Sequence, residues 1–413
     1  MDPEDDCHPS SSRRSVGASS NSSQLPKAVG SSKTAPAENA APTSSAIIMA
    51  SPEDYVPSVG RPLPLPQWLK YAPSAFYVSS TEAYEDLASK VELQVQNLLK
   101  KHNYNTVGNF VRFYMGFESS GFTQLDQFFR EYSPPITPDH YTCVGLGLEL
   151  LKKLWCLESL YAGLASKFYV VSCEEAIENV TRYTGNGRPP VQLAEKEHIL
   201  LAMRIKINNR SGFLVLDPGY HVARAVTIMA DKKYPHTGWF TQKNDEAGVK
   251  EYNYELDPTG RYLIWKIHET NRRGENNDYE SLIYVEEPFL CAVQCTERRN
   301  LVYNFKSLLA RDTKGQVIAG LYFDLTQSDT VTIFCKDDEG SKLRKKLKFS
   351  VFSGKDLPAE IEELVEDCGS QLGMLEGDLC NLLITLATIV ENKQFVQQTL
   401  AINDIVNNIA AEN

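Results

Sequence analysis

Apolar residues recur at steps of three and four after residue 80 and predict a block of helices over about 79–131. Ser79-Ser80-Thr81-Glu82 forms a capping box, which is typical of a helix start. The first helix has one apolar face, made of Tyr84, Leu87, Val91, Val95, Leu98 and Leu99. Shorter helices are expected over Val107–Met115 and around Leu125–Phe129. Ser133-Pro134-Pro135 ends the block, because proline cannot continue a helix.

Residues 143–163 predict a further helix that is apolar on nearly every side, which is typical of the buried centre of a domain. Two starts are open for it. The helix begins at Cys143, or Thr137-Pro138 caps it earlier, with Pro138 in its first position. The second alternative moves Cys143 into the second turn, where the helix dipole acts on it less strongly.

From there to about 355 the chain is rich in short runs of Val, Ile, Tyr and Phe, which predict strands. The expected strands are Lys167–Ser172, Ile199–Ile207, Phe213–Leu216, Ala223–Met229, Tyr262–Ile267, Ser281–Val285, Val317–Phe323 and Val331–Cys335. Asn208–Gly212 and Asp312–Gly315 have the composition of hairpin turns. The basic run Lys342–Lys348 follows the last of these strands and indicates a solvated edge, or else a site for a phosphorylated ligand.

The chain divides into five parts by composition. Residues 1–52 are a Ser-rich leader with 13 serines and no aromatic residue, a composition typical of disorder. A helical subdomain is expected over 53–136, a core with an antiparallel sheet over 137–250, and a β-rich subdomain over 251–355. Residues 356–413 return to helix, expected to cap the sheet of their own chain or to bind a protein partner.

Charge and cysteine content limit the function classes. The 42 Lys and Arg residues against 53 Asp and Glu give a net charge of −11, which argues against nucleic acid as the main partner. No apolar run is long enough to span a membrane, and none of the features of a secretory signal is present. Nine scattered cysteines are typical of reduced thiols, so we expect a cytoplasmic protein.

Three residues in this order can form a nucleophilic site. Cys143 lies near the start of the buried helix, His198 opens one strand and Asp217 ends the next. The turn at 208–212 makes these strands antiparallel neighbours, which brings His198 and Asp217 to the same end of the sheet. A thiolate is the attacking form of cysteine, a histidine accepts the thiol proton, and an aspartate orients the imidazole.

This order resembles the arylamine N-acetyltransferase family and, more broadly, transglutaminase-like and papain-like cysteine enzymes. The resemblance covers about 137–240 and includes Asp217-Pro218-Gly219-Tyr220, similar to the family's Asp-x-Gly-aromatic turn. A weaker similarity extends through Asn304-Phe305 and Leu308–Gly315. It implies an α+β fold of papain-like topology. It also implies an acyltransferase that moves acetyl from acetyl-CoA to Cys143 and then to a small-molecule amine, with His198 as base and Asp217 as orienting acid.

Two alternatives stay open. A transglutaminase-like amidase or peptidase would use the same triad. A catalytically inactive papain-like interaction module would explain why Asp139–Thr142 stands where the family has Arg-Gly-Gly before the cysteine. His221, Tyr220 and Trp239 are candidates for lining the substrate cleft. His221 also competes with His198 as base. We expect no metal, because Cys291 and Cys295 lack further ligands nearby in the sequence.

Overall fold

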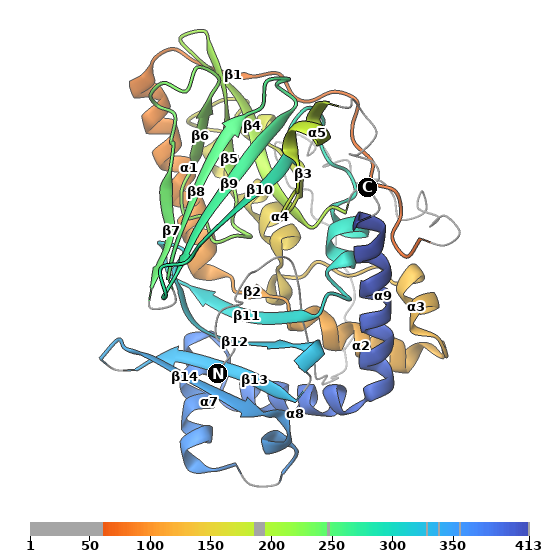
Figure 1. Ribbon diagram of the computed structural model, residues 1–413. Helices are drawn as coiled ribbons and strands as arrows, with labels where there is room; N and C mark the ends of the chain where they lie inside the picture. Colours follow the sequence, from red (N-terminus) through yellow and green to blue (C-terminus); the bar gives the residue numbers. More distant parts are fainter. Residues whose placement is uncertain are drawn as a thin grey trace, which may run out of the picture.

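The computed structural model describes residues 61–185, 195–245, 248–327, 329–337, 339–354 and 357–411. The leader expected over 1–52 lies outside these residues. The described chain is a mixture of helix and sheet, as the α+β expectation required, and it builds two separate sheets (Figure 1). The larger sheet curls into an antiparallel half-barrel.

The half-barrel has the strand order β6-β5-β4-β3-β10-β9-β8-β7, and β1 adds to β4 in parallel. Its strands are β1 (Phe76–Val78), β3 (Tyr169–Glu174), β4 (His198–Ile207), β5 (Arg210–Leu216), β6 (Val226–Met229), β7 (Phe240–Asp245), β8 (Gly248–Leu256), β9 (Tyr262–Asn271) and β10 (Asn276–Tyr284). Asn208 and Asn209 form the two-residue turn between β4 and β5, and both have positive φ, as a type I′ hairpin requires.

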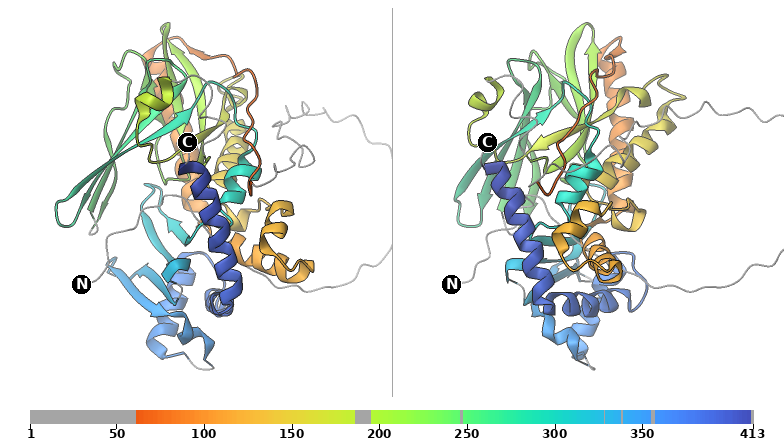
Figure 2. Two further views of the ribbon diagram at one scale, coloured as in Figure 1. Left: turned by 45° about the vertical axis from the view of Figure 1, so that its right-hand side comes forward. Right: turned by 90° about the vertical axis from the view of Figure 1, so that its right-hand side faces the viewer.

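The central strand β4 is buried on both faces, which explains its unbroken apolar sequence. Leu201 and Met203 point to the helical layer, whereas Leu200 and Ala202 point into the curl, where Trp265 is packed. The helical layer is made of α1 (Thr81–Lys101) and α4 (Cys143–Leu154), which lie together on one side of the sheet (Figure 2).

The second sheet has five strands in the order β14-β13-β12-β11-β2. They are β2 (Tyr104–Asn105), β11 (Phe305–Arg311), β12 (Val317–Asp324), β13 (Thr330–Lys336) and β14 (Lys342–Lys348). Its core is shared with α2 (Gly108–Ser120), α3 (Leu125–Glu131), α7 (Ala359–Gln371), α8 (Asp378–Glu391) and α9 (Lys393–Ala411). The apolar faces of these C-terminal helices are therefore buried against their own chain. No helix among the described residues is both long and apolar enough to cross a bilayer.

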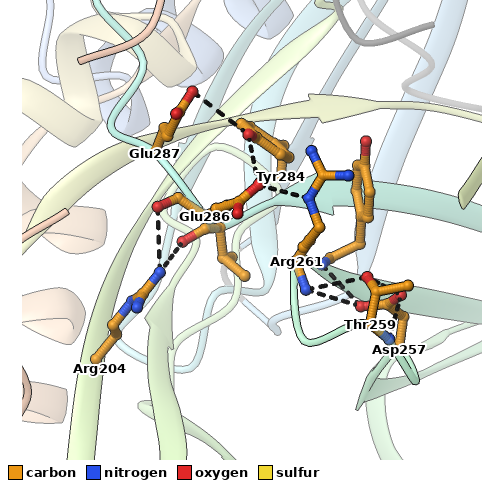
Figure 3. Close-up of polar contacts among 9 residues, drawn as sticks. Arg204, Asp257, Thr259, Arg261, Tyr284, Glu286 and Glu287 are labelled. Atoms are coloured by element: carbon orange, nitrogen blue, oxygen red, sulfur yellow. Dashed lines mark hydrogen bonds and ion pairs between the residues drawn. The ribbon is translucent and has the colours of Figure 1, made fainter. Parts of the chain in front are cut away.

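A polar network closes the end of the half-barrel at the β8–β9 turn (Figure 3). The carboxylate of Asp257 accepts hydrogen bonds from the backbone N–H groups of Arg261 and Tyr262, at 3.0 and 2.9 Å. Arg261 pairs with Glu286, and Arg204 on β4 donates to the Glu286 carbonyl at 3.1 Å. This network ties β4, β9 and the end of β10 together.

Three sequence expectations are corrected by the structure. The helix expected over 143–163 ends at Leu154, where short 3₁₀ turns replace it. The boundary expected at residue 250 falls inside β8, because β7–β10 continue the half-barrel. The helical block before residue 136 is divided between two cores: α1 packs on the half-barrel, and α2 and α3 pack on the second sheet. The solvated edge expected at Lys342–Lys348 is confirmed, since this run forms the exposed edge strand β14.

Candidate active site

Cys143 is the first residue of α4, and its position is fixed by the cap before it. The hydroxyl of Thr142 accepts a hydrogen bond from Val144 N at 3.2 Å and donates to the carboxylate of Glu297, which is fully buried. Asn109 donates to the same carboxylate at 2.6 Å. Pro138–His140 forms a separate 3₁₀ turn, so of the two helix starts that the sequence allowed, the structure has the one at Cys143. The thiol therefore lies at the positive end of the helix dipole.

The structure brings His198 and Asp217 together at one end of the β4–β5 hairpin. The Nε2 atom of His198 lies 3.0 Å from Oδ1 of Asp217, and both side chains are buried. Asp217 Oδ1 also accepts a hydrogen bond from Tyr220 N at 3.0 Å, which fixes the carboxylate. With Nε2 held by Asp217, Nδ1 is the ring nitrogen left for the thiol of Cys143.

The protonation of His198 follows from these contacts. Burial alone lowers the pKa of an imidazole, but the charge of Asp217, its hydrogen bond and a hydrogen bond with Cys143 outweigh burial. The pKa of His198 is therefore raised well above its ordinary value. This direction favours the imidazolium form of the ring, and a cation beside a thiol stabilises the thiolate.

Gly219 occupies the narrow space between the two reactive side chains. A Cβ atom at this position would lie 2.6 Å from Cys143 Cβ and 2.6 Å from His198 Cε1. Both are rigid parts of their residues, so any larger side chain must push the thiol and the ring apart. The glycine in the Asp217-Pro218-Gly219 turn is therefore required by close packing.

We expect Gly219→Ala to separate Cys143 from His198. Overpacking should cost about 1–3 kcal/mol of unfolding free energy. The displacement should slow any reaction of the thiol on the order of 10²-fold. The matched control is Gly185→Ala, because a Cβ there meets nothing within 4 Å. Denaturant unfolding and the rate of Cys143 alkylation measure the two effects. An unchanged alkylation rate would show that the thiol does not depend on this contact.

Cys143 and His198 open into a cavity of about 820 Å³ between the two sheets. The wall from the second sheet and its β11–β12 turn carries four basic side chains and one acidic side chain: Lys314, Lys336, Lys342, Arg344 and Asp312. The wall from the half-barrel carries five acidic and three basic side chains: Glu175, Glu197, Asp245, Glu269, Glu275, Lys243, Lys250 and Arg273. The two walls therefore differ in the sign of their charge.

The three candidate substrate-lining residues are placed differently. Tyr220 lines the cavity, with its ring edge-on to His198 at 4.6 Å and its hydroxyl donating to Glu175. His221 lines it too, and burial together with the charge of Arg311 holds its pKa well below the ordinary value, so it is a weak base. Trp239 is 52% exposed and is not among the cavity-lining residues.

Arg311 joins the second sheet to the loop that carries Asp217. It is buried, its Nη1 donates to the Pro218 carbonyl at 3.3 Å, and the same nitrogen lies 2.9 Å from Nδ1 of His221. The β11–β12 turn reaches the same loop, since a Cβ on Gly315 would lie 2.0 Å from the carbonyl oxygen of His221. The second sheet thus holds in place the loop that follows Asp217.

Three cavity residues were not found from the sequence. Glu197 directly precedes His198, and Glu175 follows β3, the strand paired with β4. Asn300 lies beyond the π-helical turn Ala292–Glu297, about 100 residues later. Burial raises the pKa of Glu197 to about 8, with the Glu175 charge adding to it, and burial also raises the pKa of Glu175. Glu197, an acidic residue next to the candidate base His198, was the one feature of the sequence that could have pointed to this part of the cavity.

Across the described ranges no group of three or more His, Cys, Asp or Glu side chains is arranged to hold a metal ion. The sequence matches none of the protein-family models, curated proteins or solved structures with which it was compared. The function is therefore inferred from the geometry of the site.

Proposed function

We propose that this protein is a cysteine-dependent acyltransferase of the arylamine N-acetyltransferase type, with Cys143 as nucleophile. The observation that carries the proposal is the grouping of a helix-start cysteine, an Asp-bound histidine and a large two-walled cavity. We also propose that the half-barrel and its two helices correspond to the papain-like core that this family shares.

In the proposed first step the thiolate of Cys143 attacks the thioester carbonyl of acetyl-CoA. The imidazolium of His198 gives its proton to the departing CoA sulfur, which leaves an acetyl-cysteine and a neutral imidazole. Asp217 keeps the ring oriented with Nδ1 toward the sulfur. The N–H of Val144 is taken by the Thr142 cap, but the other N–H groups at the start of α4 have no acceptor inside the helix and would stabilise the oxyanion.

The basic wall supports an anionic donor. Lys314, Lys336, Lys342 and Arg344 line the cavity on the side of the second sheet. The phosphates of a coenzyme A thioester would lie along this wall, because clustered cations attract phosphate. In the second step an amine would attack the acetyl-cysteine, and His198 would take a proton from it.

Incubating the full chain with acetyl-CoA should add one acetyl group, found on the Cys143 peptide by mass spectrometry. A following amine should remove it. A transglutaminase-like enzyme would instead take its acyl group from a glutamine peptide and release ammonia. An interaction module would form neither adduct, and that result would contradict the proposal.

A further inference from the structure

The half-barrel wall places two carboxyl groups beside the reactive residues. Glu175 and Glu197 both line the cavity that Cys143 and His198 enter. The backbone N–H of Glu175 donates to Oε2 of Glu197 at 3.1 Å, so the two acids are held next to each other. Glu175 also accepts from the hydroxyl of Tyr220, whose ring touches His198.

Asn300 adds a polar atom that its own chain leaves unsatisfied. It is 2% exposed, it lines the same cavity, and its Oδ1 has no hydrogen-bond partner among the described residues. A buried acceptor without a partner destabilises the protein unless a ligand donates to it. A ligand that fits here therefore carries N–H or O–H donors.

We propose that Glu175, Glu197 and Asn300 form the acyl-acceptor subsite and select a protonated aliphatic amine over a neutral aromatic amine. The inference rests on the proposed acyl transfer at Cys143. An alkylammonium group has three N–H donors and a positive charge, which suit two carboxyl groups and an amide oxygen. An arylamine is uncharged at neutral pH and offers these two acids no cation with which to pair.

The proton balance agrees with this assignment. An ammonium nitrogen has no lone pair, so it must lose a proton before it attacks. One proton goes to a carboxylate of the Glu175–Glu197 pair, one goes to the neutral His198, and the third stays on the amide nitrogen. The new N–C bond forms as the C–S bond breaks, and the electron pair of the C–S bond returns to the sulfur of Cys143. The thiolate and imidazolium of the resting site are thereby restored.

The test uses two measurements on the full chain, with 1,4-diaminobutane as the cationic probe. Calorimetric titration of the unacetylated protein should show binding of the diamine and no binding of 1,4-butanediol, its uncharged analogue. Glu175→Gln and Glu197→Gln should each weaken diamine binding on the order of 10- to 100-fold, because each replaces an acid that can pair with an ammonium by a neutral amide. Glu118→Gln is the matched control, since this exposed α2 residue changes net charge equally and lies outside the cavity.

The second measurement starts from the acetylated Cys143 and follows its discharge. The diamine should discharge it faster than aniline does, and each glutamine variant should lose that advantage. Faster discharge by aniline, or no diamine binding to the wild-type protein, would overturn the acceptor assignment. If acetyl-CoA never loads Cys143, the proposed function fails. The titration then still decides whether the cation site exists.

Discussion

Cys143→Ser is expected to abolish the acetyl adduct while leaving the chain folded. The serine hydroxyl keeps the size of the buried side chain but is a far weaker nucleophile at neutral pH. The contact with Asp217 raises the pKa of His198, and the protonated ring that this favours cannot accept the proton of a serine. Intact-mass analysis after incubation with acetyl-CoA should therefore show only unmodified protein.

Cys143→Ser should also remove the thiol that reacts fastest with iodoacetamide. At about pH 6 iodoacetamide should label Cys143 first, because the imidazolium beside it stabilises the thiolate. Burial raises the pKa of Cys173 and of Cys368, which makes these thiols unreactive. Cys156 is exposed, so Cys156→Ser is the matched control and should leave the early label in place. Early labelling of any other cysteine would remove the basis for a nucleophilic Cys143.

The position of the triad follows from local signals in the sequence. Two asparagines in a row fix a two-residue turn, and the turn sets the β4–β5 register, with Leu201 opposite Leu216. His198 and Asp217 lie just beyond that pair and must come close to each other. The placement of Cys143 needed more than periodicity, since the hydrophobic pattern allowed two helix starts. Glu297, more than 150 residues away, binds the cap that accompanies the observed start.

The acceptor side of the cavity could not be predicted in the same way. Glu175 and Glu197 are brought together by the pairing of β3 with β4, and nothing in a single sequence reports strand pairing across a loop. Asn300 reaches the cavity only because the chain packs back after β10. From sequence alone, isolated polar residues are expected to be exposed to solvent, and only the fold shows which of them are buried.

Strands with polar sequences were also missed. β7 and β8 contribute polar residues to the cavity wall, which are Gln242, Lys243, Asp245 and Lys250. β14, by contrast, was expected as a solvated edge: it consists of Lys, Arg and Leu, a composition that protects an exposed edge from pairing with other chains. Apolar alternation finds strands that face a core, whereas β14 faces solvent and β7 and β8 contribute part of the cavity wall.

Asp217→Asn is expected to reduce acyl transfer on the order of 10²- to 10⁴-fold while keeping the shape of the site. Tyr220 N holds the amide oxygen on the side of Oδ1, so the ring orientation should survive. The negative charge is lost, and with it one of the causes that raise the pKa of His198. The imidazolium that stabilises the thiolate should then persist only to a lower pH. Alkylation of Cys143 across the pH range measures this shift.

The stability of this variant has a definite pH dependence. A histidine whose folded pKa exceeds its unfolded value of about 6.5 stabilises the protein fully below that pH and loses this contribution as pH rises through the folded pKa. The wild-type advantage over Asp217→Asn should therefore shrink as pH rises. Asp257→Asn is the matched control, because this carboxylate also accepts backbone hydrogen bonds but follows the end of β8, whereas the cavity is lined by the first half of that strand. Asp257→Asn should lower the free energy of unfolding by a similar amount across the pH range and leave acyl transfer intact. Near-wild-type turnover in Asp217→Asn would remove Asp217 from the mechanism and leave a Cys143–His198 dyad.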